Sequence, residues 1–352
     1  MFRMILFAAA ALFALPTIRG AMTTQPARSA TAIDAPGSAI DAPGSVSSTV
    51  RAGAGAGAGA GDAGWSDVAI KAAKDFTVSQ RKKLHELGAL DIQRPIRITG
   101  EPITINTTRM NMNIQHKNTN DEIENSNNEN TNTKIIHFQR HSQGYHNLIC
   151  DIWREKGLPI DFDSHDSNLN PVIRPEFIDP PLTETGRQQG IARRNQCASL
   201  SPQLLIVSPL LRCIQTAKLS FRDHGTDKIK WIAHEGCREE LGLLNGNKRR
   251  PLQDIQHDYP DIDFTSYIEH DEDFLWDNYG DRRETLLEKS QRIYGFLGEF
   301  VRNRPEREIA IVSHSAYLFT LMNAVMDIED EELRSWFLTS EVRSMKVTFL
   351  SS

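Results

Sequence analysis

The chain has 352 residues, with 46 acidic residues against 40 lysines and arginines, so its formal net charge at pH 7 is −6. This length suits one large domain or two small ones, and the mildly acidic balance argues against nucleic-acid binding through a general basic field. The four cysteines are widely spaced and form no CxxC pair, which argues against a zinc site. Their even number allows two disulfides in a secreted protein, although nothing in the spacing requires them.

The first 21 residues have the features of a targeting segment. Arg3 supplies a positive charge, residues 5–15 form an apolar run, and the small residues Gly20 and Ala21 offer a cleavage point. This pattern favours the secretory pathway and an extracellular product. The absence of acidic residues before Asp34 also suits import into an organelle, a mitochondrion or a plastid. An uncleaved anchor is a third alternative, but the run is short for a bilayer, so we expect no stable span in the mature protein.

Residues 22–133 are expected to be largely disordered. A seven-residue sequence occurs twice in tandem at 32–45, and an alternating Gly-Ala tract follows at 52–61. Such low-complexity segments bury too little apolar surface to offset the entropy of ordering them. Apolar spacing predicts short helices within 65–100, whereas the Asn- and Thr-rich stretch 106–133 is interpreted as a second linker.

Residues 134–352 have the composition of a globular domain, in which apolar runs alternate with amphipathic stretches. This alternation indicates an α/β fold, a three-layer sandwich whose mostly parallel sheet carries helices on both faces. Four apolar runs are predicted to be strands of this sheet: 134–139, 203–207, 228–232 and 308–312.

Three of these strands lead into a helix through a junction that carries basic side chains. The first junction holds Arg140 and His141, the second places Arg212 in the first turn of a helix after Ser-Pro, and the third holds His314. In open α/β sheets, ligands bind beyond the carboxyl ends of the strands, where helix N-termini also offer unpaired N–H groups. Each junction alone could be surface polarity or helix capping. Three junctions of the same type, all with basic side chains, together predict a pocket for a dianion such as phosphate.

Four motifs here resemble those of the histidine phosphatase superfamily, also called the phosphoglycerate mutase-like family. They follow the order and spacing of the family from residue 134 to about 349, and they lie at 140–142, 179–186, 208–217 and 312–315. The amino-acid sequence at 141–147 and 271–276 is most similar to that of a plant and fungal subgroup of the family. The resemblance implies the phosphoglycerate mutase-like α/β fold for the globular part.

The resemblance also implies an enzyme that hydrolyses a small phosphomonoester through a phosphohistidine, without a metal or other cofactor. His141 would be the nucleophile, because an unprotonated imidazole nitrogen is a competent one. Arg140, Arg212 and His314 would stabilise charge on the phosphoryl oxygens, and Asn147 would contact the phosphate. The expected partner is therefore a small phosphorylated substrate, which the sequence does not identify further.

A carboxylic acid is expected to protonate the leaving group. Two adjacent candidates, Glu239 and Glu240, follow the strand predicted at 228–232, and the pattern of the resembled subgroup points to Glu239. A bound phosphate would raise the pKa of this carboxyl by like-charge repulsion. Ser142 departs from the glycine usual in the family, and we expect it to narrow the pocket without abolishing activity.

Two further interpretations stay open. A mutase of the phosphoglycerate type would return the phosphoryl group to the substrate, and a non-catalytic family member would only bind. The binding interpretation is weakened because all four basic residues of the site are present. His137, His141 and His146 lie close together in sequence, but no carboxylate or cysteine stands at ligand spacing, so no metal site is expected.

Overall fold

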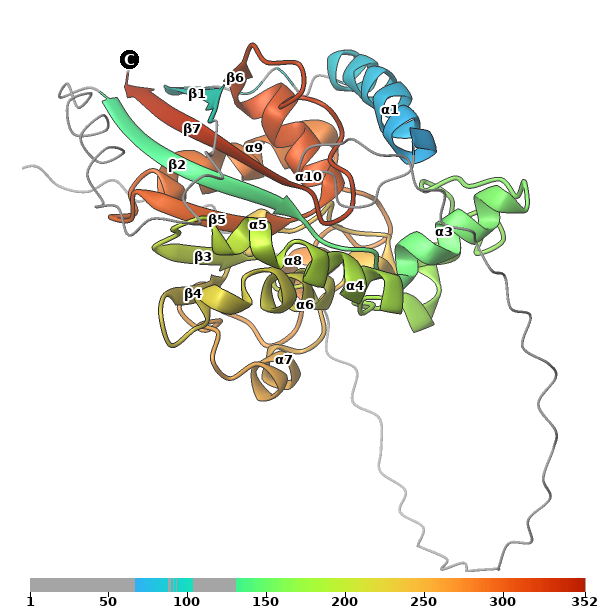
Figure 1. Cartoon of the computed structure of the whole chain (residues 1–352). Coiled ribbons are helices and arrows are strands. Elements are labelled where there is room, and N and C mark those ends of the chain that lie inside the picture. Colours follow the sequence, from blue (N-terminus) through green and yellow to red (C-terminus); the bar gives the residue numbers. More distant parts are fainter. Residues whose placement is uncertain (1–66, 88–89, 91, 93, 104–130, 352) are drawn as a thin grey trace, which may run out of the picture. The chain divides into compact units, whose positions relative to one another are not determined.

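A mixed sheet of seven strands forms the centre of the computed structural model, which describes residues 67–87, 90, 92, 94–103 and 131–351. The strands lie in the order β4-β3-β5-β2-β7-β1-β6 (Figure 1). Neighbouring strands are parallel, except that β7 runs antiparallel to both β2 and β1. The strands are β1 (Ile96–Pro102), β2 (Thr131–Arg140), β3 (Leu204–Val207), β4 (Lys230–Ala233), β5 (Glu308–Ser313), β6 (Asp327–Ile328) and β7 (Val342–Ser351).

Helices connect most of these strands. The α-helices are α1 (Asp67–Glu86), α3 (Tyr145–Glu155), α4 (Glu184–Ala192), α5 (Arg194–Ala198), α6 (Leu211–Ser220), α7 (Leu252–Asp258), α8 (Phe274–Asp277), α9 (Leu286–Gly295) and α10 (Ser315–Thr320). Two π-helical stretches, η7 (Phe296–Val301) and η8 (Leu321–Val325), continue α9 and α10. Short 3-10 turns are η2 (Pro171–Ile173), η3 (Pro175–Phe177), η4 (Arg222–His224), η5 (Glu235–Cys237) and η6 (Asn245–Asn247).

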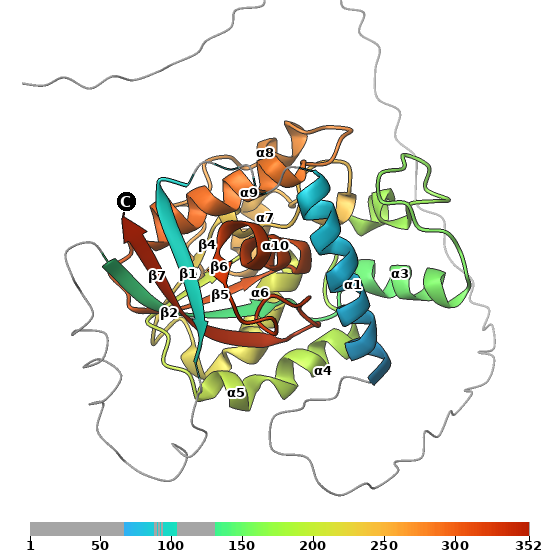
Figure 2. The ribbon, with the colours of Figure 1, turned by 90° about the horizontal axis from the view of Figure 1, so that it is seen from above.

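The central strands are buried on both faces, and their alternate side chains divide the core in two. Leu204 and Ile206 of β3 belong to a cluster with side chains of α9, α10 and their π-helical extensions. Leu205 and Val207 belong to a second cluster, with side chains of α5, α6 and α7. Successive side chains of a strand point to opposite faces. The helices therefore cover both faces, as Figure 2 shows for α9 and α5, and the expected three-layer α/β sandwich is confirmed.

The strands expected from continuous apolar runs are confirmed as β2, β3, β4 and β5. β2 begins at Thr131, so the Asn- and Thr-rich stretch expected as a linker up to residue 133 ends inside the sheet. The last three residues of this stretch, Thr131 to Thr133, pair with β7. The side chain of Asn132 also donates to the carbonyl oxygen of Arg302 at 2.6 Å. Pairing with a neighbouring strand thus overrides the polar composition.

Two elements that precede residue 134 belong to the same fold. The segment expected to hold short helices within 65–100 contains one helix, α1, and the strand β1. β1 pairs along its whole length with β7 and also contacts β6. α1 packs its Phe76 edge-on against Trp336, with ring centroids 4.5 Å apart, and Thr77 Oγ1 accepts from the backbone N–H of Trp336 at 2.8 Å. The sheet thus also includes Ile96–Pro102, which lies before the boundary expected at residue 134.

Several expectations concern residues that the structure does not describe. The targeting segment at 1–21, the tandem repeat and the Gly-Ala tract lie outside the described residues. The four cysteines lie within them, and all are buried free thiols, so the disulfides that their number allows are not formed. Within the described ranges, no helix has both the length and the apolar character needed to cross a bilayer.

The pairing of β1 predicts that the segment before residue 104 stabilises the domain. Ile98 of β1 is 1% exposed, so we expect Ile98→Ala to lower the free energy of unfolding by about 2–5 kcal/mol through the cavity that it leaves. Val78 of α1 is 72% exposed, and Val78→Ala should change it by less than about 0.5 kcal/mol. Urea denaturation of both variants measures the difference. Equal and small effects would show that β1 is not part of the folded unit.

Candidate active site

The carboxyl ends of β2, β5 and β3 lie side by side, and the residues that follow them form the candidate active site. Arg140 of β2 stands opposite Ser313 of β5, and β3 pairs with the same end of β5. This register places His141 beside His314, with ring centroids 5.1 Å apart. The three junctions singled out in the sequence thus meet at the edge where open α/β sheets bind ligands.

His141 is held in one orientation by its own backbone. The ring is 1% exposed, and its Nδ1 lies 2.7 Å from the carbonyl oxygen of Ser142. A carbonyl only accepts, so Nδ1 carries the proton and Nε2 keeps its lone pair. Burial, assisted by the charge of Arg212, holds the pKa of His141 well below its usual value. The imidazole is therefore neutral at physiological pH, as a nucleophile must be.

Arg140 and Arg212 supply positive charge and are held by neutral acceptors. Arg140 Nη1 donates to the carbonyl oxygen of Phe337 at 2.7 Å. Arg212 donates from Nη1 to the carbonyl oxygen of Gly246 at 2.6 Å and from Nη2 to Oδ1 of Asn247 at 2.9 Å. The Nε of each arginine is buried without a hydrogen-bond partner in the described part of the chain. Burying an unpaired donor costs about 1–3 kcal/mol, so this arrangement favours a bound anion.

His314 is fully buried and contacts two polar side chains. Its Nε2 lies 2.7 Å from Ser208 Oγ and 3.4 Å from Cys213 Sγ. Burial and the charge of Arg212 hold the pKa of His314 well below its usual value. Burial also raises the pKa of the Cys213 thiol, so the sulfur stays protonated. His314 is therefore a neutral imidazole whose orientation is set by Ser208 from the β3 junction.

Glu240 forms a buried ion-pair network away from the histidines. Lys289 donates to its carboxylate at 2.9 Å, and Arg283 binds the other carboxylate oxygen. Burial alone would raise the pKa of Glu240, but the charges of Lys289 and Arg283 outweigh burial and lower it to about 2. A carboxyl held ionised by two cations cannot deliver a proton near neutral pH. Glu240 therefore serves the stability of the fold.

Glu239 faces the other way, toward the third junction. Its carboxylate accepts from the backbone N–H groups of Ala316 at 3.2 Å and Tyr317 at 3.0 Å, in the first turn after His314. Among the charges around Arg140, that of Glu239 acts on it most strongly. Of the two adjacent carboxylates, Glu239 is thus the one placed to reach a group bound between the arginines.

Asn147 and Ser142 have contacts that the sequence did not reveal. Asn147 Oδ1 accepts from the backbone N–H of Gly144 at 3.0 Å, which closes the first turn of α3. This contact leaves its amide Nδ2 as the group that can donate to an anion. Ser142 is buried, and its Oγ points toward α4, where a Cβ added at Gly190 would lie 3.5 Å away. Ser142, at a position where the resembled family usually has glycine, is therefore accommodated by a glycine of the neighbouring helix.

His146 is a residue of this site that the sequence analysis considered only as a metal ligand. Its ring centroid lies 5.4 Å from that of His141. Its Nδ1 is buried without a partner among the described residues. Burial and the charges of Arg212 and Arg140 hold its pKa well below the usual value. The sequence signal that could have identified His146 as a site residue is its position in the first turn of the helix that follows the Arg-His junction.

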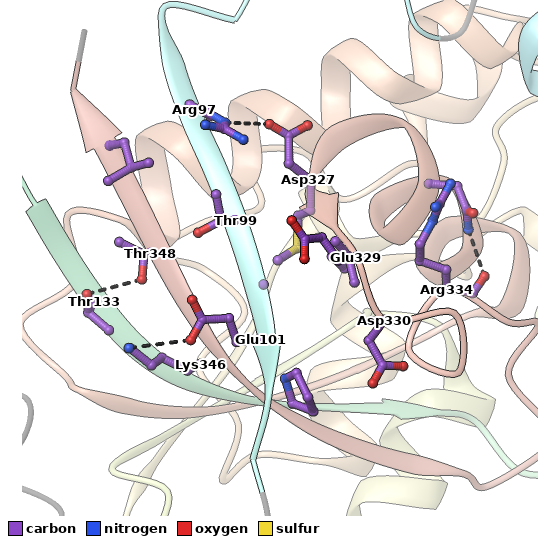
Figure 3. A pocket seen from close by; sticks show the side chains of 16 residues that line it. Arg97, Thr99, Glu101, Thr133, Asp327, Glu329, Asp330, Arg334, Lys346 and Thr348 are labelled. Atoms are coloured by element: carbon purple, nitrogen blue, oxygen red, sulfur yellow. Dashed lines mark hydrogen bonds and ion pairs between the residues drawn. The ribbon is translucent and has the colours of Figure 1, made fainter.

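A separate cavity of about 970 Å³ lies at the β1-β6 edge of the sheet (Figure 3). Four of its charged lining residues form two ion pairs: Arg97 with Asp327 at 2.7 Å, and Lys346 with Glu101 at 3.5 Å. Neither catalytic histidine candidate lines it. Across the described ranges, no group of three or more histidine, cysteine, aspartate or glutamate side chains has the geometry to hold a metal ion.

Comparison with known proteins gives a family match that covers half of the chain. The model of the histidine phosphatase superfamily (branch 1) matches residues 174–349, a range that starts after Arg140 and His141. Phosphoglycerate mutase-like protein 1 of Arabidopsis thaliana is 31% identical over 248 residues, covering 61% of this chain and 81% of that protein. A second phosphoglycerate mutase-like protein of the same plant is 32% identical over 247 residues, covering 61% and 84%.

Two solved structures are similar at lower identity. A mycobacterial glucosyl-3-phosphoglycerate phosphatase has a TM-score of 0.37 and 17% identity, covering 60% of this chain and 92% of that one. The alpha-ribazole phosphatase of Shigella flexneri has a TM-score of 0.38 and 17% identity, covering 62% and 96%.

The different partners of the two glutamates predict different costs of mutation. At pH 7 we expect Glu240→Gln to lower the free energy of unfolding by about 3 kcal/mol, because two cations lose their buried counter-charge. The pKa of Glu240 is lower in the folded chain than in the unfolded chain, so this stabilisation is present above about pH 4.5 and is lost as the pH falls toward 2. Urea denaturation at pH 7, 4 and 3 should show the variant approaching the wild type. Glu239→Gln is the control, and an equal loss in both variants at pH 7 would contradict the assignment.

Proposed function

Because this chain belongs to the histidine phosphatase superfamily, branch 1, we propose that it hydrolyses a small phosphomonoester through a phosphohistidine on His141. One observation carries this proposal. The Nδ1 of the buried, neutral His141 is hydrogen-bonded to the carbonyl of Ser142, and the buried Nε atoms of Arg140 and Arg212 lack partners in the described residues. A fixed nucleophile and unpaired cationic donors together suit transfer of a phosphoryl group.

The first step forms a bond between His141 Nε2 and phosphorus while the bond from phosphorus to the leaving oxygen breaks. Negative charge on the equatorial oxygens is stabilised by Arg140 and Arg212, and by hydrogen bonds from His314 and Asn147 Nδ2. Burial lowers the pKa of Arg140 only to about 10, so the guanidinium stays charged at neutral pH. These groups supply the positive charge that the reaction needs, and the proposed mechanism requires no metal.

The departing alkoxide takes a proton from Glu239. The Glu239 carboxylate accepts from the backbone N–H groups of Ala316, Tyr317 and Glu240, and these hydrogen bonds fix its orientation. As the general acid, this carboxyl gives its proton to the leaving oxygen while the bond to phosphorus breaks. In the second step Glu239 takes a proton from a water molecule while the water oxygen forms a bond to phosphorus. The bond between phosphorus and His141 Nε2 breaks, which releases inorganic phosphate and frees the imidazole.

The alternative function is that of a mutase. It is supported by the names of the two plant relatives, which are both called phosphoglycerate mutase-like. A mutase would use the same phosphohistidine but would return the phosphoryl group to an alcohol. Secretion through the segment at 1–21 also remains a proposal, as does import into an organelle. A purely binding role is disfavoured, because Arg140, His141, Arg212 and His314 all meet at one edge of the sheet.

If His141 is the nucleophile, a phosphoryl group must rest on it between the two steps. Quenching turnover of a radiolabelled phosphomonoester with alkaline detergent, which denatures the enzyme without acid, should trap label in an acid-labile, base-stable linkage. His141→Ala should abolish both label and turnover. His314→Ala should keep some label while slowing turnover by about 10²–10³-fold, as when one oxyanion donor is removed. Label on His314 in the His141→Ala variant would reverse the two roles.

The role of Glu239 as an acid predicts a dependence on the leaving group. Glu239→Gln should slow hydrolysis of alkyl phosphates by about 10²–10⁴-fold, because an alkoxide cannot leave without a proton. Aryl phosphates, whose leaving groups are stable as anions, should lose far less. Comparison of kcat/KM for the two substrate types in wild type and variant gives the measurement. Equal losses on both types would remove Glu239 from this role.

A further inference from the structure

His146 is placed over the turn that carries His141. A Cβ added at Gly144 would come within 2.8 Å of His146 Nδ1 and Cε1, so the ring folds back over this turn and needs a glycine beneath it. The backbone at Gly144 has φ −94°, which any residue can adopt. The glycine is therefore required by the space that the His146 ring occupies.

The other side of the His146 side chain faces the loop that holds Arg212. A Cβ added at Gly246 would lie 3.6 Å from His146 Cβ, and the carbonyl of the same Gly246 accepts from Arg212 Nη1. Arg212 and Arg140 are the charges that act most on the His146 imidazole. His146 is thus enclosed between the nucleophile's turn and the Arg212 loop, close to both guanidiniums.

The ring nitrogen inside this enclosure has no partner in the described part of the chain. His146 Nδ1 is buried, and a polar nitrogen buried without a hydrogen bond costs free energy that a ligand can recover. A neutral imidazole offers one N–H donor, and it adds no third positive charge that would draw electrons from His141. An oxygen of a bound phosphoryl group is the acceptor that the two guanidiniums would bring to this place.

We propose that His146 is a further substrate-binding residue, whose Nδ1–H donates a hydrogen bond to an oxygen of the bound phosphoryl group. The proposal rests on the proposed function in that it shares the same anion, but it concerns binding and not the covalent step. The side chain would therefore bind the phosphoryl group directly from the first turn of α3, the helix that follows the nucleophile.

Three substitutions of His146 distinguish the contribution of its Nδ1 donor from that of its aromatic ring. Asparagine places its amide Nδ2 where His146 has Nδ1, glutamine places its amide further out, and phenylalanine keeps the ring without a donor. His257, which is 90% exposed, provides a surface control as His257→Gln. Affinity for inorganic phosphate and for vanadate is measured by calorimetry on the full chain, with the melting temperature recorded for each variant.

We expect His146→Phe to weaken phosphate and vanadate binding on the order of 10- to 100-fold, the loss of one hydrogen bond to a charged group. His146→Gln should be similarly weak, whereas His146→Asn should stay within a few-fold of wild type. Equal affinities in all variants, or equal losses in His146→Asn and His146→Gln, would overturn the proposal. If phosphate binds through His146 but no phosphohistidine forms on His141, the proposed hydrolysis fails while the binding role stands.

Discussion

Positive charge buried at the carboxyl edge of the sheet is the constraint on which the site and its surroundings depend. Arg212 and Arg238 are both fully buried, yet they are compensated in different ways. Arg238 binds both oxygens of Asp273, at 2.6 and 2.7 Å, so its charge is matched inside the fold. Arg212 is held by Gly246 and Asn247, which are neutral. A guanidinium kept in place without a counter-charge at those contacts retains its attraction for an incoming anion.

Asn247 joins these two arginines. Its carbonyl oxygen accepts from Arg238 Nη2 at 2.5 Å, its Oδ1 accepts from Arg212, and its Nδ2 donates to the carbonyl of Glu240 at 2.8 Å. The loop that orients the substrate-facing arginine is thus anchored by the arginine that is fully paired. The same division separates the two glutamates. Glu240 is bound by cations, whereas the Glu239 carboxylate accepts from backbone N–H groups alone within the described part of the chain. Charges that are paired inside the protein stabilise it, and those without a counter-charge at their contacts are the ones that we propose to act on the substrate.

Much of this could be predicted from sequence because the signals are local. β3 and β5 are continuous apolar runs that end in the motif residues, so both the strands and the meeting of His141 with His314 followed from the pattern. β1 and β7 were missed because their pairing joins distant segments, and the alternation of Met345, Val347 and Phe349 was not recognised. Glu239 and Glu240 point in opposite directions in an irregular segment. Their orientations depend on partners 43 to 78 residues away, which local sequence cannot indicate.

The position of β1 in the sheet affects the order in which the domain can be completed during synthesis. β1 leaves the ribosome before every other strand of the described chain, but both of its neighbours, β7 and β6, come from the last part of the domain. Ile98 therefore cannot pair with Phe349, its partner in the register, until Phe349 has been synthesised near the end of translation. Contacts between segments so far apart form slowly, and an unpaired strand is prone to associate with other chains in the meantime. During synthesis, β1 therefore has no partner strand until β6 and β7 have been made.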